Sequence, residues 1–449
     1  MPDQNAVFKA YDIRGRFPEE LDEPLAETIG RAFARLVRRN EPGTAQVALG
    51  RDMRPSGVPL AAAFTRGLAA EGLGVIDLGL ASTDLVYFAS GHLDVPAAIL
   101  TASHNPAGYN GMKLCLSGAR PVGHDTGLSQ MAAEVVDGFD DGPGGGLTTS
   151  RDLLPAFADH VRSFVDVEVL RPLRVVADTA NGMGGLVVPA VFADLPFELD
   201  LLYPELDGTF PNHPADPIQP ENLRDLQARV LDTGADVGLA FDGDADRVFL
   251  VDERARLVSG STTTALIARR VLQREPGATV LHNLICSRAV PEVIAENGGR
   301  AVRTQVGHSI IKQAMADEGA AFAGEHSGHY YFRDNYRADS GLIAALLVLE
   351  ALSESDGAMS ELLAPYERYA ASGERNTAVG DPAAAIDRVA AHYADWPQDR
   401  LDGLTVDLGD WWFNLRPSNT EPLLRLNVEA ADEATCQDRV TEVQAVVGQ

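Results

Sequence analysis

A serine beside a histidine and an asparagine stands in a loop that follows an apolar run. The run, Val95 to Leu100, predicts a buried strand, and the loop reads Thr101-Ala102-Ser103-His104-Asn105-Pro106. Two glycines and Lys113 follow within residues 107–113. A serine hydroxyl held at a strand end, with His104 beside it, could carry a phosphoryl group. An ordinary polar turn uses the same residue types, so these residues alone leave both interpretations open.

The most specific local pattern is Asp242-Gly243-Asp244-Ala245-Asp246-Arg247, which lies between two apolar stretches. Three carboxylates at alternate positions can converge on one hard divalent cation. An EF-hand calcium loop has similar spacing, and Glu253 falls at its twelfth position. Such a loop needs a glycine where Arg247 stands and helices where the flanks predict strands. Magnesium held by a few carboxylates and a phosphate oxygen fits better, and an acidic solvent-facing turn is the minor alternative.

Two further loops carry groups that suit a phosphorylated sugar. Arg416-Pro417-Ser418-Asn419-Thr420, with Arg425 nearby, combines guanidinium, hydroxyl and amide donors as a phosphate site requires. A hairpin turn with an exposed arginine is the alternative. Gly324-Glu325-His326-Ser327-Gly328-His329 offers a carboxylate, a hydroxyl and imidazoles that can bind sugar hydroxyls. Metal binding by its histidines is the less favoured reading, because the aspartate loop is the better hard-ion site.

Lysine is rare in this chain, and each lysine lies beside a polar or glycine-containing loop. Only Lys9, Lys113 and Lys312 occur, so arginine supplies 37 − 3 = 34 of the basic residues. A lysine kept in such a chain is a candidate for work that needs a compact, titratable ammonium, although chance is the alternative. Lys113 and His308 are candidate proton-transfer groups, because both can titrate near neutrality when partly desolvated.

The charge and cysteine content exclude several classes of protein. A formal net charge of −28 argues against nucleic acid and anionic membrane surfaces as partners. An acidic chain can still bind a small phosphorylated molecule where its arginines gather in one cleft. The three cysteines form no CxxC pair, and the N-terminus shows no signal peptide, so we expect a cytoplasmic protein. Nothing in the sequence implies an obligate protein partner.

Strands and helices alternate along most of the chain, which predicts α/β domains with mostly parallel sheets. Ligands of such sheets bind beyond the carboxyl ends of the strands, where Ser103 falls. The predicted strands are 7–14, 47–49, 75–78, 95–100, 173–178, 235–241, 279–284, 300–304 and 320–323. The predicted helices are 24–38, 59–70, 155–165, 262–273 and 341–351. Each of the first three units ends a strand in a polar loop, which is a weak sign of internal repetition.

Two other segments bear on domain organisation. The glycine-rich run at 142–146 predicts a linker and a domain boundary. After about residue 361 the pattern changes to a helix at 382–392 and alternating strands at 404–408, 411–415 and 423–428, which predicts an α+β domain. The glycine-rich turn at 178–185 lacks the full dinucleotide or P-loop pattern, so a structural turn is favoured there.

Taken together, the loops resemble those of the α-D-phosphohexomutase superfamily. Five motifs carry the resemblance in order along nearly the whole chain, at Lys9–Gly15, Thr101–Pro106, Asp242–Arg247, Gly324–His329 and Arg416–Pro422. The resemblance implies three related α/β domains and a C-terminal α+β domain around a central cleft. We therefore expect domains at 1–145 with the phosphoserine loop, 146–251 with the metal loop, 252–360 with the sugar loop and 361–449 with the phosphate loop.

The resemblance also implies a role for each candidate residue. Ser103 would be the phosphoserine and would complete a magnesium site with Asp242, Asp244 and Asp246. Groups expected to assist proton transfer or stabilise the moving phosphoryl group are His104, Lys113, Arg14 and His308. Groups expected to bind the substrate are Tyr11, Arg247, Gly307, Glu325, Ser327, His329, Arg416, Ser418, Asn419, Thr420 and Arg425.

The implied reaction moves a phosphoryl group within one hexose. Phosphoserine donates to the free hydroxyl, the resulting hexose 1,6-bisphosphate turns over in the cleft, and Ser103 takes back the other phosphate. The bisphosphate is the expected activator, and a phosphorylated hexose is the expected partner. Trp412 to Arg416 and Tyr331 to Asp334 resemble bacterial phosphomannomutases, whereas His326 and Asn419 depart from phosphoglucosamine mutases. Phosphoglucomutase or dual specificity is the nearest alternative.

One position departs from some bifunctional relatives, and two other classes of protein remain. Those relatives carry a lysine where Ile285 stands, which leaves a cleft contact that Arg288 could supply. A metal-dependent phosphatase with Asp242 as nucleophile would keep its activity without Ser103. A non-catalytic phosphosugar-binding protein would never carry phosphate on Ser103.

Overall fold

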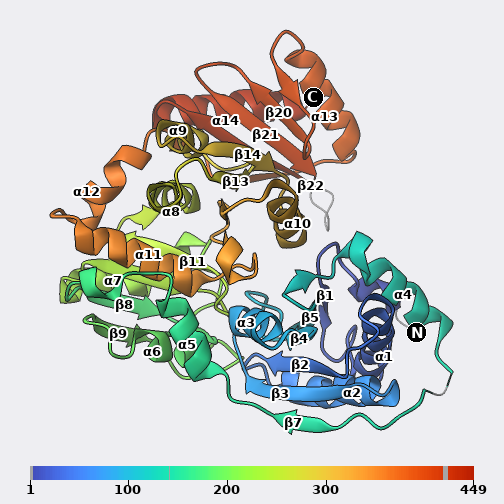
Figure 1. Cartoon of the computed structure of the whole chain (residues 1–449). Coiled ribbons are helices and arrows are strands. Elements are labelled where there is room, and N and C mark those ends of the chain that lie inside the picture. The colour runs from blue at the N-terminus through green and yellow to red at the C-terminus, as the bar shows by residue number, and fades with distance from the viewer. Residues whose placement is uncertain (1–3, 141, 418–422, 449) are drawn as a thin grey trace.

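The computed structural model describes residues 4–140, 142–417 and 423–448, and these residues form four sheets that follow one another along the chain (Figure 1). The first three sheets are mixed and the fourth is antiparallel, so the predicted combination of three α/β units with an α+β unit is confirmed. Over the described residues, no helix is both long and apolar enough to span a bilayer.

The first sheet has the strand order β1-β5-β4-β2-β3-β7, and β6 pairs with β5. Its middle strands run parallel, while β1 and β5 run antiparallel to their neighbours. The strands are β1 (Ile13–Arg16), β2 (Gln46–Arg51), β3 (Gly74–Leu80), β4 (Ala97–Leu100), β5 (Tyr109–Leu116), β6 (Arg120–Pro121) and β7 (Thr148–Ser150). The helices are α1 (Glu23–Asn40), α2 (Gly57–Ala70), α3 (Thr83–Leu93) and α4 (Leu128–Asp137).

The second and third sheets repeat one plan, three parallel strands followed by an antiparallel one. The second has β8 (Arg174–Asp178), β9 (Glu198–Leu202), β10 (Val237–Phe241), β11 (Val248–Asp252) and β12 (Leu257–Val258), with α5 (Leu154–Arg162), α6 (Gly184–Phe192) and α7 (Arg224–Thr233). The third has β13 (Thr279–Asn283), β14 (Arg300–Thr304), β15 (Phe322–Gly324) and β16 (Tyr330–Phe332), with α8 (Gly260–Arg274), α9 (Ala289–Glu296), α10 (His308–Glu318), α11 (Gly341–Glu354) and α12 (Met359–Leu363).

The fourth sheet has a core of its own, whereas one continuous apolar core joins parts of the first three units. Its strands are β17 (Ala370–Ala371), β18 (Arg375–Ala378), β19 (Gln398–Asp399), β20 (Leu404–Asp407), β21 (Trp412–Pro417) and β22 (Leu423–Ala430), covered by α13 (Pro382–His392) and α14 (Glu433–Val447). Short 3-10 helices occur at η1 (Gln4–Val7), η2 (His124–Thr126), η3 (Val167–Val169), η4 (Pro220–Leu223), η5 (Arg333–Asn335) and η6 (Ala364–Tyr366).

The predicted repetition takes a definite form in the structure. In each of the first three units, the polar loop joins a parallel strand to the antiparallel strand beside it: β4 to β5, β10 to β11 and β15 to β16. The loops carry Ser103, the three aspartates and Glu325 respectively. One hairpin design therefore positions three of the four predicted site loops.

Some predicted elements are shorter in the structure than expected. The strand predicted at 7–14 is wrong over most of its length, because the Lys9 backbone N–H donates to the Asp12 carbonyl, 2.8 Å, in a turn that precedes β1. The strand predicted at 95–100 begins at Ala97, since the Val95 N–H is bonded to Ser90 at the end of α3. Here local turn and cap hydrogen bonds take the backbone groups that a sheet would use.

Helices α1 and α2 cross through two glycines. A Cβ atom added to Gly67 would lie 2.0 Å from the Glu27 carbonyl oxygen, and one added to Gly30 would lie 2.4 Å from the Phe64 carbonyl oxygen. The two backbones therefore touch directly, which sets the distance between α1 and α2.

We predict that Gly67→Ala destabilises the protein by about 2 kcal/mol, because even one methyl group must push the two helices apart. The measurement is the midpoint of urea unfolding. Gly43→Ala is the matched control, since a Cβ at that exposed loop position meets nothing within 4 Å. Equal midpoints for the two variants would contradict the close packing described here.

Candidate active site

Ser103 occupies a buried and strained position in the loop between β4 and β5. It is 4% exposed and has a φ of 49°, a left-handed conformation that is uncommon for serine. Its backbone N–H donates to Thr101 Oγ1, 2.9 Å, and its hydroxyl donates to Asp242 Oδ2, 2.6 Å. His104 Nδ1 lies 3.2 Å from the same hydroxyl oxygen. The serine oxygen is therefore aimed at the aspartate loop, as the phosphoserine interpretation requires.

A buried arginine that the sequence analysis did not identify shapes this loop. Both terminal nitrogens of Arg54 donate to backbone carbonyls of the loop, with Ser103 and Pro106 each 2.8 Å away. The carbonyls of Asn105 and Tyr109 accept from it as well, and Asp52 balances its charge. The signal was an Arg-Asp-x-Arg run that begins at Arg51, the last residue of strand β2, whose end adjoins that of β4 in the parallel sheet.

The three aspartates of the loop between β10 and β11 are fully buried, and ligand atoms of all three lie within 4.8 Å of one another. Asp244 Oδ1 and Asp246 Oδ1 have no hydrogen-bond partner among the described residues. Buried, unpartnered carboxylate oxygens that converge in this way fit a hard divalent cation. Gly243 permits the close approach, because a Cβ there would lie 2.4 Å from the Ser103 carbonyl oxygen.

The three aspartates differ in the direction in which their pKa values are shifted. Burial is the main cause that raises the pKa of Asp242 to about 6, against the opposing charge of Arg247, and that of Asp246 to about 7. The negative charge of Asp244 contributes to both values. Burial also opposes ionisation of Asp244, but the Lys113 ammonium outweighs it and holds the pKa of Asp244 below its usual range. Lys113 Nζ lies 2.9 Å from Asp244 Oδ2 and 2.5 Å from Asp246 Oδ2.

The expectation that Lys113 and His308 titrate near neutrality is wrong for this state of the protein. Burial lowers the pKa of Lys113, but Asp244 and Asp246 overcome it and hold the pKa well above its usual value. Lys113 is therefore a fixed ammonium. Burial, and then the charge of Lys312, lowers the pKa of His308 well below its usual value. His308 is a neutral ring without a described hydrogen-bond partner.

Two arginines flank the serine. Arg247 Nε lies 3.0 Å from Asp242 Oδ2, and its backbone N–H donates to the other oxygen of the same carboxylate, 3.2 Å. Arg14 donates to Asn105 Oδ1, 2.6 Å, and pairs with Asp12, 2.5 Å. Because Asn105 belongs to the serine loop, the structure brings Arg14, Ser103 and the aspartate loop together.

The sugar loop between β15 and β16 lies against the aspartate loop. The Glu325 carboxylate accepts from Tyr331 Oη, 2.8 Å, and from Asn283 Nδ2, 3.2 Å, two partners that the sequence analysis missed. Ser327 Oγ lies 3.1 Å from His329 Nδ1, and His329 Nε2 lies 3.7 Å from Asp246 Oδ1. Glu325 is thus held in place by its neighbours, and His329 adjoins the aspartate cluster.

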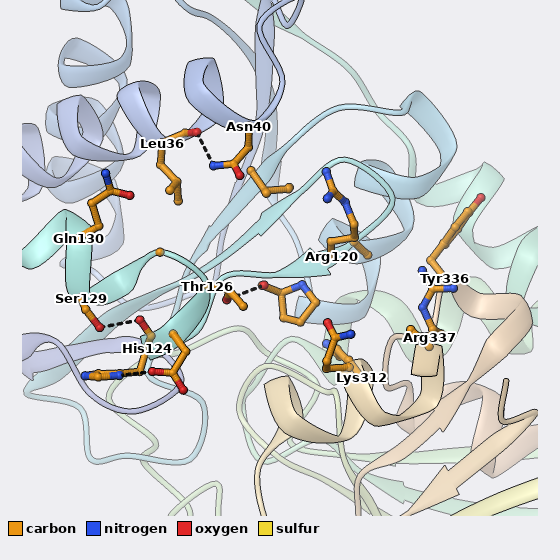
Figure 2. A pocket seen from close by; sticks show the side chains of 17 residues that line it. Leu36, Asn40, Arg120, His124, Thr126, Ser129, Gln130, Lys312, Tyr336 and Arg337 are labelled. Carbon is orange, nitrogen blue, oxygen red and sulfur yellow. Dashed lines mark hydrogen bonds and ion pairs between the residues drawn. The ribbon is translucent and has the colours of Figure 1, made fainter. Parts of the chain in front are cut away.

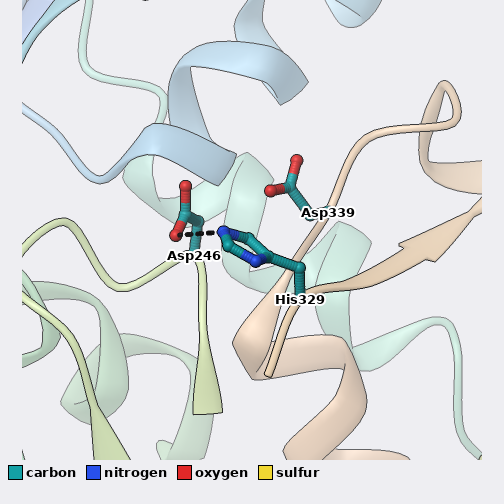
Figure 3. A group of neighbouring side chains, drawn as sticks. All are labelled: Asp246, His329 and Asp339. Carbon is teal, nitrogen blue, oxygen red and sulfur yellow. Dashed lines mark ion pairs between the residues drawn. The ribbon is translucent and has the colours of Figure 1, made fainter. Parts of the chain in front are cut away.

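Asp246, His329 and Asp339 form a second group that could in principle hold a metal ion (Figure 3). Its central member is an imidazole rather than an oxygen donor, so it suits magnesium less well than the three aspartates do. His326 is not part of this group, because its Nδ1 lies 3.0 Å from Asn283 Nδ2. In these contacts the ring nitrogens of His326 and His329 do not converge on one position for a metal ion.

Tyr11 and Gly307 meet on another side of the site. Tyr11 Oη donates to the Val306 carbonyl, 3.0 Å, and its ring lies edge-on to His308 at 5.9 Å. Gly307 has a φ of 131°, and a Cβ there would lie 2.6 Å from the Tyr11 ring. This glycine lets a loop of the third unit close onto a tyrosine of the first.

The predicted phosphate loop is described only in part. Arg416 and Arg425 both pair with Glu374, at 3.0 and 3.6 Å, a carboxylate that the sequence analysis did not identify. Burial, and then the charge of Arg416, lowers the pKa of His326 to about 3, so the arginine loop faces the sugar loop. Ser418, Asn419 and Thr420 lie outside the described residues.

Arg288 does not supply the cleft contact left open by Ile285. Its guanidinium pairs with Asp407, 2.5 Å, and donates to the Gly409 carbonyl, 2.5 Å. Its backbone N–H donates to Glu429, 3.0 Å. Arg288 therefore connects the third unit to the fourth.

The first turn of α3 supports the site from behind, although its sequence showed no pattern typical of a site. Thr83 donates its hydroxyl to Asp244 Oδ2, 2.6 Å, and its backbone N–H to the Asp244 carbonyl, 3.0 Å. The fully buried Asp84 accepts from Ser340, 2.8 Å, and from Ser82. One helix end therefore connects the first unit to the second and the third.

A separate cavity of about 840 Å³ has Lys312 of α10 in its wall (Figure 2). Its walls come from α1, the β6–η2 region and α10, with Arg120, Arg337 and Tyr336 among them. It shares none of the residues predicted for the site. The chemistry therefore lies with the converging loops rather than with this cavity.

A buried serine aimed at three carboxylates, with the fixed ammonium of Lys113 and the guanidinium of Arg247 beside them, is the arrangement that phosphoryl transfer requires. Profiles of the phosphoglucomutase/phosphomannomutase family match most of the chain: α/β/α domain I at residues 5–135, domain II at 155–256, domain III at 259–369 and the C-terminal domain at 374–446. The chain belongs to this family of the α-D-phosphohexomutase superfamily, and it is an isomerase of the phosphotransferase type.

Similar proteins span nearly the same length. A Xanthomonas campestris protein named for phosphohexose mutases is 43% identical over 444 residues, which are 97% of this chain and 98% of that one. A Salmonella montevideo phosphomannomutase is 41% identical over 448 residues, 97% of each chain. A solved phosphoglucomutase/phosphomannomutase family protein from Burkholderia thailandensis is 32% identical, with a TM-score of 0.90 over 100% of this chain and 98% of that one.

We predict that Asp84→Asn changes how stability depends on pH. Burial raises the pKa of Asp84 to about 7, against about 4 in an unfolded chain. The folded protein therefore holds a proton that the unfolded chain releases, and stability falls by up to about 1.4 kcal/mol per unit as pH rises from about 4 to about 7. Asparagine has no such proton, so the variant gains stability relative to the parent over that range.

The measurement is the urea unfolding midpoint of both proteins across this pH range, in a buffer with a chelator. Each serine hydroxyl can still share a hydrogen bond with the amide, so the variant is expected to fold. Parallel curves for the two proteins would show that Asp84 is already ionised in the folded state.

Proposed function

We propose that this chain is a magnesium-dependent phosphomannomutase that interconverts mannose 6-phosphate and mannose 1-phosphate. The observation that carries the proposal is the 2.6 Å contact between the Ser103 hydroxyl and Asp242 inside the group of three buried aspartates. The named relatives support mannose as the hexose. Phosphoglucomutase or dual specificity is the competing reading, because mannose and glucose differ at one hydroxyl only.

In the proposed reaction, the fourth unit holds the phosphate that the substrate already carries. Arg416 and Arg425 supply positive charge, and Ser418, Asn419 and Thr420 are proposed as further donors. Glu374 shares the two guanidinium groups when no phosphate is present. Because this unit has its own core, we propose that it can shift as a body to enclose the substrate.

The sugar is oriented by the loop of the third unit. Glu325 is locked by Tyr331 and Asn283, so its remaining acceptor capacity can be offered to hexose hydroxyls. Ser327 and His329 lie beside it, with Tyr11 and Gly307 proposed on another side. The free hydroxyl of the hexose would then face the phosphoryl group on Ser103.

The transfer breaks the bond between phosphorus and Ser103 Oγ and forms one to the hexose oxygen. The hexose hydroxyl gives its proton to a neighbouring base, and Ser103 Oγ takes up a proton to become a hydroxyl again. The bisphosphate then turns over, and Ser103 takes the other phosphoryl group, which leaves the isomeric monophosphate. Lys113, Arg247 and Arg14 offset charge on the moving group, and we propose His104, which burial keeps neutral, as a proton acceptor. His308, which lies beside Tyr11, is proposed to assist proton transfer or to stabilise the moving phosphoryl group.

A magnesium ion held by Asp242, Asp244, Asp246 and a phosphoserine oxygen would supply electrostatic stabilisation of the transferring phosphoryl group. Hexose 1,6-bisphosphate is proposed as the activator, because it can restore the phosphoryl group to an enzyme that has lost it. The three unpaired, buried cysteines support a cytoplasmic location.

We predict that Ser103 carries a removable phosphoryl group and that Ser103→Ala lowers the turnover of mannose 1-phosphate by at least about 10³-fold, because the phosphoryl acceptor is lost. Intact-mass spectrometry before and after incubation with mannose 1-phosphate, and with mannose 1,6-bisphosphate, measures the modification. Steady-state rates with mannose and glucose 1-phosphates measure the preference, which we expect to favour mannose.

Other outcomes assign the chain to a different class. A Ser103→Ala protein that keeps its activity and releases free phosphate is a phosphatase. A Ser103 that stays unmodified after incubation with the bisphosphate leaves only phosphosugar binding. A higher kcat/KM with glucose 1-phosphate makes the chain a phosphoglucomutase.

We predict that the metal affinity belongs to the three aspartates. Asp242→Asn and Asp244→Asn should weaken magnesium binding by about tenfold or more, because each removes an anionic oxygen ligand. His329→Gln is the matched comparison from the second group and should bind the ion as the parent does. Calorimetric titration with magnesium chloride measures this without any reaction. A loss confined to His329→Gln would instead place the ion between Asp246, His329 and Asp339.

A further inference from the structure

Lys312 on α10 is a buried cation that the proposed reaction does not use. It is 2% exposed, and its Nζ lies 2.9 Å from Asp339 Oδ1. The same nitrogen lies 3.6 Å from the centroid of the Tyr87 ring on α3. Asp339 belongs to the third unit and Tyr87 to the first, so one ammonium joins two units.

A lysine suits this position better than the arginine that is used elsewhere in the chain. The ammonium is a compact charge that can approach a ring face and one carboxylate oxygen, whereas a guanidinium is a wide planar fork. Burying an ammonium is costly unless an anion and a polarisable face compensate for it. Asp339 supplies the anion, and Tyr87, itself only 3% exposed, supplies the face.

Asp339 in turn adjoins the reacting groups. Ligand atoms of Asp339, His329 and Asp246 lie within 4.8 Å of one another, and Figure 3 shows the His329 ring beside both carboxylates. Lys312 therefore balances the charge of the carboxylate that backs the sugar loop. Without the Lys312 side chain, the buried Asp339 carboxylate would lose its ion-pair partner next to the aspartate loop, which favours movement of this segment away from α3.

Tyr87 belongs to α3 of the first unit, the same helix whose first turn supports the aspartate loop. It lies one turn after Thr83, which bonds Asp244, and Asp84, which accepts from Ser340. Ser340 directly follows Asp339 in the chain. The Asp339–Ser340 segment is thus held to α3 twice, once by a hydrogen bond and once through Lys312 and the ring face.

We propose that Lys312 is a positioning residue that holds the sugar loop against the serine unit while the bisphosphate turns over. The inference rests on the proposed function, because only a mutase must retain such an intermediate. When the contacts of Lys312 with Asp339 and Tyr87 are lost, the bisphosphate leaves before the second transfer, and Ser103 remains without its phosphoryl group. Added hexose bisphosphate restores it by giving one phosphoryl group to Ser103 and leaving as the monophosphate.

The test compares Lys312→Met with Arg66→Met, which removes an exposed cation on α2 that belongs to none of the site loops. Initial rates with mannose 1-phosphate are measured over a range of added mannose 1,6-bisphosphate. We expect Lys312→Met to need about tenfold more bisphosphate for half-maximal rate, with a smaller change in KM for mannose 1-phosphate. Arg66→Met should match the parent.

A second pair of variants examines the ring face and covers a failure of Lys312→Met to fold. Tyr87→Phe keeps the face and should behave as the parent, whereas Tyr87→Leu should raise the bisphosphate requirement as Lys312→Met does. In the double variant the two effects should not add, because they break one contact.

The outcomes separate this inference from the function on which it rests. A lowered Tm with an unchanged bisphosphate requirement in Lys312→Met and Tyr87→Leu shows a merely structural role and overturns the inference. Equal effects of Tyr87→Phe and Tyr87→Leu overturn the role of the ring face. A parent protein that shows no turnover of mannose 1-phosphate at any bisphosphate concentration overturns the proposed function instead.

Discussion

Three aspartates share one buried loop, and the repulsion between their charges is the constraint on which the rest of the site depends. No side chain of the three is exposed, and burial raises the pKa of Asp242 and of Asp246 well above ordinary values. Only Asp244 is driven the other way, by an ammonium from another unit. The loop therefore cannot hold its charge alone and needs positive groups brought to it from outside.

The arrangement of the units follows from that need. Lys113 comes from β5 of the first unit and Arg247 from the aspartate loop itself, whereas Lys312 of α10 pairs with the neighbouring Asp339 of the third unit. Lys113 can reach the cluster because the first three units place their loops in equivalent hairpins and share a continuous core. The fourth unit keeps a separate core and contributes arginines rather than part of the cluster. A fourth unit with its own core, joined to the third by the contacts of Arg288, is compatible with the movement proposed for it.

Much of this could be predicted from the sequence. The loops that carry Ser103, Asp242 to Asp246 and Glu325 were evident because each follows a buried strand and concentrates reactive residue types. The titration expected of Lys113 and His308 was wrong, because the pKa depends on partners more than a hundred residues away in the first case and on complete burial in the second. Arg54, Thr83 and Asp339 were missed for a similar reason. The partners of these three residues are distant in the sequence, and no local sequence pattern predicts the contacts.

The sequence by itself determined which groups are available and on which turns they stand, because strand ends and loop composition are local properties. It also determined the family, through motifs whose order survives without any knowledge of contacts. The tertiary structure alone decided which groups are charged and what each one touches. Both depend on burial and on distances between units. Lys113, which was expected to titrate if partly desolvated, is therefore a fixed cation between two carboxylates.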